Sequence, residues 1–138
     1  MKGENVIRSL FQVFWPPVVV FCLHMLRQIF LPSHIEIDVV AHFLGGLSMA
    51  WVAWNIHRFW LKRTPFKELS FWYQAFVYVA FAELVGTLWE MMEFYILLGL
   101  IPSLPLTYAD TISDLTMDLT GAIVFVALLG LVRRRSRL

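Results

Sequence analysis

Residues 108–132, YADTISDLTMDLTGAIVFVALLGLV, run from a series of acids directly into an apolar segment. Asp110, Asp114 and Asp118 are spaced four residues apart, so a helix through this stretch carries all three on one face. The part from Thr111 to Val132 has about the ~20 residues that cross a bilayer. This stretch therefore predicts a membrane helix whose first turns carry carboxylates.

Three further apolar segments approach or exceed that length: Val6 to Phe30, Ile37 to Trp60 and Leu69 to Ile101. Because 59% of the 138 residues are hydrophobic and only 15% are charged, an ordinary soluble domain is excluded. We expect an all-α integral membrane bundle of four transmembrane helices, forming a single domain over residues 1–138. Pro16 and Pro17 predict a distortion in the first helix, since they remove two backbone donors. The third segment is long enough to break near Gly99 or Pro102.

The basic residues predict the orientation. Every Lys and Arg except Arg27 lies near the start of the first segment, near the connection between the second and the third, or after the fourth. The positive-inside rule then places both termini in the cytoplasm. We expect a multi-pass membrane protein and interpret the terminal arginine run as a topology anchor, not a nucleic-acid-binding tail. We assign His24, His34 and His57 to the membrane interface.

On this topology, most acids fall toward the opposite, outer side. Successive helices carry them at similar depth, at ~1.5 Å of rise per residue. Faces that carry such groups turn inward in membrane proteins, toward each other or a watery cavity. We therefore expect one shared site opening to the outer side, with Glu83 below it. Its expected members are Asp38, His42, Glu90, Glu93, Asp110, Asp114 and Asp118.

These acids require neutralisation, because one charge near a helix centre costs ~2.5–3.5 kcal/mol. Arg27, near His24, is the only Lys or Arg at this end and cannot balance them. We expect the seven residues to bind a divalent metal ion (Mg, Mn or Zn), since carboxylates suit hard cations and His42 admits softer ones. Protonation is the alternative, above all for Glu83. Asp38 and Asp110 are also candidates for helix N-caps.

Three motifs carry a resemblance: DVVAHFLGGLSMAW (38–51), WEMMEFY (89–95) and YADTISDLTMDLTGA (108–122). Together they resemble the YjdF-like group of small bacterial inner-membrane proteins, and the first is also similar to VanZ-like proteins. The resemblance implies that the same seven residues form one polar site, and it implies no reaction. The spacing in DTISDLTMD (110–118) is similar to the aspartate motifs with which intramembrane prenyltransferases and CDP-alcohol phosphotransferases hold Mg²⁺ against a phosphate.

Three function classes follow. The first is a metal-dependent hydrolase or transferase acting on a phospholipid or polyprenyl phosphate in the bilayer, with His42, Glu90 and Asp114 catalytic. Arg27 and His24 are the expected substrate-binding residues. The second class is a divalent-cation or proton-coupled transporter, for which four helices would have to form a homo-oligomer to enclose a path. The third is a structural metal site.

Overall fold

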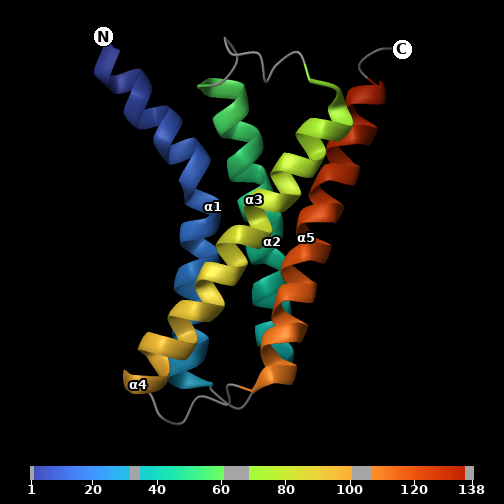
Figure 1. Ribbon diagram of the computed structural model, residues 1–138. Helices are drawn as coiled ribbons and strands as arrows, with labels where there is room; N and C mark the ends of the chain where they lie inside the picture. The colour runs from blue at the N-terminus through green and yellow to red at the C-terminus, as the bar shows by residue number, and fades with distance from the viewer. Residues whose placement is uncertain (1, 32–34, 61–68, 101–106, 136–138) are drawn as a thin grey trace.

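The computed structural model describes residues 2–31, 35–60, 69–100 and 107–135. Its long helices are α1 (Lys2–Phe30), α2 (Ile35–Phe59), α3 (Phe71–Met92) and α5 (Tyr108–Arg135) (Figure 1). A π-helical segment, η2 (Glu93–Leu97), and a short turn, α4 (Leu98–Leu100), continue α3. Four helices in these ranges are long and apolar enough to cross a membrane, and the described residues contain no strand. This confirms the all-α fold with four membrane-spanning helices.

The helix ends differ from the apolar segments. α2 begins at Ile35 and α5 at Tyr108, each before its predicted start, because polar residues continue the helix beyond the apolar run. The third segment leaves the α conformation at Glu93, well before the break predicted near Gly99 or Pro102. Pro102 and His34 lie outside the described residues. A π turn inserts one extra residue and so rotates the side chains that follow it.

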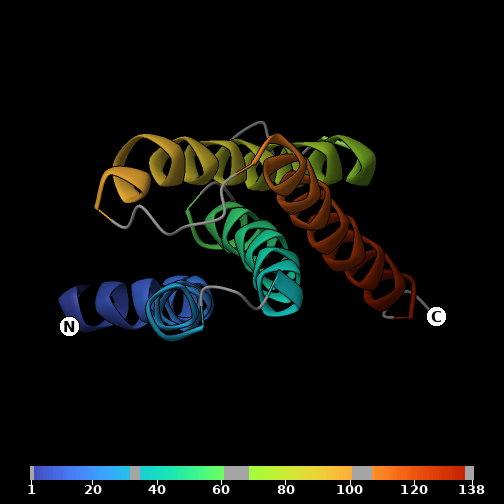
Figure 2. The ribbon, with the colours of Figure 1, turned by 90° about the horizontal axis from the view of Figure 1, so that it is seen from below.

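Helix α1 changes direction along its length. Pro16 and Pro17 stand inside it, and proline is the usual cause of a sharp kink. Figure 2 shows one part of α1 running away from the bundle while the other part is seen nearly end-on beside α2. Both ends of the chain's helical course, at Lys2 and Arg135, lie at the same end of the bundle (Figure 1). The side of the membrane that this end faces stays a prediction.

Helix α2 lies at the centre, packed against α1, α3 and α5, and α3 also packs against α5 (Figure 2). Glycines allow the backbones of α2 and α5 to pack in direct contact. A Cβ atom on Gly46 would overlap the carbonyl group of Asp118, and one on Gly121 would overlap the carbonyl oxygen of Phe43. This close approach fixes Asp118 beside the helix that carries His42.

The apolar core lies between α2, α3 and α5 and consists largely of small residues. The outward faces of all four long helices are exposed and apolar, as a lipid bilayer environment requires. The buried core members are Ala50, Ala53, Ala75, Tyr78, Ala82, Ala122 and Val126.

Candidate functional site

A group of buried polar residues gathers at the end of the bundle where α2 and α5 begin and α3 passes into η2 (Figure 1). We call it the acidic cluster. All four long helices, with η2, supply members, and nearly all of them are more than nine-tenths buried. The members are His24, Arg27, Gln28, Asp38, His42, Glu90, Glu93, Asp114 and Asp118, with the less buried Asp110 beside them.

His42 lies at the centre of this cluster. Its Nδ1 atom is 3.2 Å from Oδ2 of Asp118, within hydrogen-bond distance. Its Nε2 atom is 3.7 Å from Oδ2 of Asp114 and 3.9 Å from Oε1 of Glu90. These last two distances exceed the ~2.7–3.2 Å of an N–H···O bond. Neither Nε2 of His42 nor Oε1 of Glu90 has a hydrogen-bond partner, although both atoms are buried.

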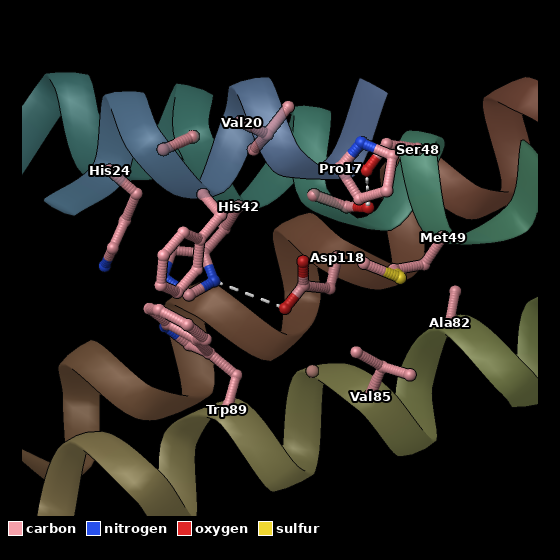
Figure 3. A pocket seen from close by; sticks show the side chains of 14 residues that line it. Pro17, Val20, His24, His42, Ser48, Met49, Ala82, Val85, Trp89 and Asp118 are labelled. Carbon is pink, nitrogen blue, oxygen red and sulfur yellow. Dashed lines mark hydrogen bonds and ion pairs between the residues drawn. The ribbon is translucent and has the colours of Figure 1, made fainter. Parts of the chain in front are cut away.

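The carboxylate of Asp118 occupies a space that glycines leave open. A Cβ on Gly86 would stand 2.6 Å from its Oδ2 atom, and a Cβ on Gly45 would stand 3.1 Å from its Oδ1 atom. The close contact of α2 with α5 holds the backbone of the same residue. Asp118 is therefore held from α2, α3 and α5 at once, and its oxygen faces the imidazole ring of His42 (Figure 3).

Helix α1 supplies ion-pair and hydrogen-bond partners for two further buried carboxylates, those of Asp38 and Glu93. Arg27 contacts Oδ2 of Asp38 through Nη1 at 2.9 Å, and Nδ1 of His24 is 3.3 Å from its Oδ1. Glu93 accepts a bond from Nε2 of Gln28 at 2.7 Å and lies 2.7 Å from Nε2 of His24. Arg27 and His24, which we expected to bind substrate, thus contact Asp38 and Glu93 within the cluster.

Three groupings within the described residues have ligand atoms all within 4.8 Å of one another, which is close enough to share a metal ion. They overlap at His42 and at Asp38. The groupings are His24 with Asp38 and His42, His42 with Glu90 and Glu93, and Asp38 with Asp110 and Asp114. Six of the seven predicted ligands fall in these groupings. Asp118 belongs to none of these groupings. Its carboxylate instead contacts Nδ1 of His42.

Two predicted alternatives are wrong. Asp110 is not the N-cap of α5, because its own backbone N–H donates to Oγ1 of Thr107 at 3.1 Å, and Thr107 is the residue that caps. Asp38 lies within the first turn of α2, which begins at Ile35, and so is past the cap position. His24 and His57 are buried within the bundle, at 4% and 8% exposed, and their depth in the membrane stays a prediction.

Sequence reasoning missed Gln28. Its signal is visible in retrospect, because His24, Arg27 and Gln28 follow the three- and four-residue spacing of one helix face in an otherwise apolar segment. The pairing of Glu93 with His24 and Gln28 also escaped prediction, since the π turn that begins at Glu93 cannot be read from the spacing of the acids.

An apolar cavity of about 100 Å³ adjoins the cluster (Figure 3). It lies between the four long helices, and its polar wall contains His24, His42 and Asp118. Apolar side chains form most of the remaining wall: Pro17, Val20, Phe21, Met49, Val85 and Trp89. A ligand that combined a short apolar length with an anionic or metal-bound head could therefore occupy the cavity and reach the cluster.

The electrostatics of the cluster are one-sided. Five carboxylates from the described residues are buried there, against one guanidinium and two imidazoles. Acceptors deprived of both water and donors are strongly unfavourable in a poorly polarisable interior. A cation placed among them would bind strongly for the same reason. The arrangement is thus suited to hold a divalent ion.

The fold and this cluster define a class: a small multi-pass membrane protein with a carboxylate- and histidine-rich interior. Residues 13–135 match the family described as Predicted membrane protein (DUF2238), and the chain belongs to that family. No curated protein and no solved structure matches the chain.

Proposed function

We propose that this protein is a membrane-embedded metalloenzyme, a divalent-metal-dependent hydrolase or phosphotransferase that acts on a lipid or polyprenyl phosphate. The observation that carries the metal is the pair of buried, unpartnered atoms, His42 Nε2 and Glu90 Oε1. They are 3.9 Å apart, and Asp114 Oδ2 is 3.7 Å from the same nitrogen. The motifs further support membership in the YjdF-like group within the family.

These separations favour a metal ion over a shared proton. Two ligand atoms bonded to one ion at ~2.0–2.5 Å stand roughly 3–4 Å apart, depending on the angle between them. A proton shared between the same atoms would instead draw them to the ~2.7–3.2 Å of a hydrogen bond. His42 and Glu90 are therefore proposed as primary ligands together with Glu93, which shares their grouping, and Asp114 joins them from the neighbouring grouping with Asp38 and Asp110.

Asp118 has a supporting role in this proposal. If Nδ1–H of His42 donates to Asp118, the lone pair of the ring lies on Nε2, the atom that faces Glu90 and Asp114. Metal-binding histidines are commonly oriented by such a carboxylate, which also raises their basicity. The glycine-lined space around Asp118 gives this orientation a rigid origin.

The apolar cavity supports a lipid-linked substrate. It reaches the cluster at His42 and Asp118 and otherwise presents apolar walls, so a short part of an acyl or isoprenyl chain could lie there with its phosphate toward the metal. A bound divalent ion would polarise the phosphoryl group and activate water. Arg27, paired with Asp38, supplies a guanidinium and His24 a ring nitrogen near the proposed phosphate position.

The buried polar side chains of α2 give the transport alternative no specific support. Ser48 and Asn55 are the buried polar side chains of α2 that lie between the cluster and the last turn of the helix. Ser48 donates to the carbonyl of Gly45 and Asn55 to that of Trp51, within their own helix. They thus satisfy their own helix backbone and do not line a relay.

The test is phosphate release by purified protein from phosphatidic acid, phosphatidylglycerol phosphate and polyprenyl phosphates or pyrophosphates. Each substrate is assayed with Mg²⁺, Mn²⁺, Zn²⁺ or chelator. Glu90→Gln and Asp114→Asn should abolish metal-dependent turnover, while Glu36→Gln, an exposed acid in the first turn of α2, should leave it unchanged. Metal binding without turnover of any phosphate substrate would reject the enzyme and leave a structural metal site.

A further inference from the structure

A second groove lies at the opposite end of the bundle, between α3 and α5. Its volume is about 560 Å³, within the ~300–1,000 Å³ typical of sites for small ligands. The walls are apolar for most of its length, and it ends at two arginines of the last turn of α5. The groove is lined by Phe71, Trp72, Val79, Ile123, Arg133 and Arg134, among others.

Arg133 is held at this end by two residues of α3. Its Nη1 atom donates to Oε1 of Gln74 at 3.2 Å, and its guanidinium carbon lies 5.1 Å from the ring centre of Phe71. Gln74 is 5% exposed, and its own amide nitrogen donates to the carbonyl of Leu69 at 3.0 Å. The amide is therefore oriented with its oxygen toward the arginine. The guanidinium of Arg133 on α5 is thus held against α3 by contacts within the protein itself.

This arrangement exceeds what a topology anchor requires. A positive-inside signal depends on the number of basic residues near the end of a helix, and no individual guanidinium needs a fixed position. Here one arginine is built into the wall of an apolar groove, while Arg135, two residues on, is exposed and does not line it. Among the described residues that line the groove there is no Asp or Glu.

We propose that this groove binds an anionic phospholipid, with one acyl chain along its apolar wall and the phosphate against Arg133 and Arg134. A guanidinium has five N–H donors, so contacts to Gln74 and to a phosphate are compatible. Basic pockets between membrane helices are a recurrent way of binding anionic headgroups, and the cytoplasmic leaflet expected at this end is rich in them. The site is at the other end of the bundle from the acidic cluster, so it does not rest on the proposed enzyme.

The test measures lipid binding to purified, delipidated protein in neutral detergent, by native mass spectrometry and by thermal unfolding. Phosphatidylglycerol is compared with phosphatidylcholine and with glycerol 3-phosphate. We expect phosphatidylglycerol alone to raise the melting temperature. Arg133→Gln and Arg134→Gln should each weaken its binding roughly fivefold, as expected for about one basic contact. The matched charge control, Arg135→Gln, should leave binding unchanged.

A second variant tests the groove itself and leaves all charges in place. Ala127 is exposed and lines the groove, so Ala127→Phe fills it without disturbing the core, and it should abolish the preference for phosphatidylglycerol. Equal losses for Arg134→Gln and Arg135→Gln would reduce the effect to net charge and overturn the proposal. Stabilisation by glycerol 3-phosphate alone, or equally by phosphatidylcholine, or unchanged binding in Ala127→Phe, would overturn it as well.

Discussion

The two ends of this bundle bury polar residues in opposite ways. At the basic end, donors and acceptors are paired: His57 hydrogen-bonds Tyr78, and Gln74 accepts from Arg133. In the acidic cluster, acceptors exceed donors, and atoms such as Glu90 Oε1 remain without a partner. The same helices α2, α3 and α5 form both ends, so helix packing alone does not explain the difference. The basic end thus satisfies the hydrogen bonds of its buried groups, whereas the excess of buried acceptors in the acidic cluster is the basis of the proposed metal site.

The largest loss of stability should come from removing a donor from the acidic cluster, where buried acceptors already exceed donors. Arg27→Gln removes the guanidinium 2.9 Å from Asp38 and leaves that buried carboxylate with His24 as its remaining ion partner. Breaking a buried ion pair from one side costs about 3–5 kcal/mol, so unfolding in detergent should occur at much lower denaturant concentration. The double variant with Asp38→Asn should recover most of the loss. Equal stability of wild type and Arg27→Gln would show that the Arg27–Asp38 ion pair does not stabilise the fold.

A smaller effect should follow from separating α2 and α5. Gly46→Ala places a methyl group against the carbonyl of Asp118, and the helices must shift to admit it. Such overpacking costs about 1–3 kcal/mol, and it should also weaken metal binding because Asp118 moves away from His42. Gly99→Ala is the matched control, since no atom lies within 4 Å of the new Cβ. If both variants melt alike, the close helix approach is not what positions the cluster.

The smallest effect should come from the paired end. Tyr78→Phe removes the hydroxyl group that bonds His57 but keeps the fully buried ring. Loss of one buried hydrogen bond costs roughly 1 kcal/mol. Thermal unfolding should show this modest loss while the response to metal ions is unchanged. A lost metal response would mean that the two ends are coupled, and the contrast between them would no longer hold.

The sequence predicted the helices well because the length and polarity of the segments determine membrane spans almost alone. It also predicted which acids of α2, α3 and α5 gather, since four-residue spacing places Asp114 and Asp118 on one face. Spacing could not give the rotation of one helix against another. The contribution of Gln28 and the pairing of Asp118 with His42 depend on that rotation, and the π turn at Glu93 is a local backbone feature that the spacing of the acids does not encode.

At the basic end, sequence reasoning interpreted the arginines only as an orientation signal. A count of charges near a helix end cannot distinguish Arg133 from Arg135. The difference comes from Gln74 and Phe71, two residues far away in sequence whose side chains meet Arg133 only when α3 and α5 pack. The hydrogen bond of His57 escaped prediction for the same reason, because its partner Tyr78 lies on another helix.

Direct metal titration is the sharpest test of whether the acidic cluster binds a divalent ion. Purified protein is stripped with chelator, and binding of Mn²⁺, Zn²⁺ and Mg²⁺ is followed by calorimetry together with the melting temperature. We expect saturable binding of at least one ion with a rise in melting temperature. An ion that binds only the folded state stabilises it by about 2.7 kcal/mol at a hundredfold excess over Kd.

Variants make that titration specific to the acidic cluster. Asp114→Asn should abolish the rise, Asp118→Asn should weaken metal affinity about 10–100-fold, and the exposed Glu36→Gln should behave as wild type. A wild-type protein whose melting temperature ignores every ion and the chelator, with no heat of binding, would contradict the account. The acidic cluster would then be neutralised by protons.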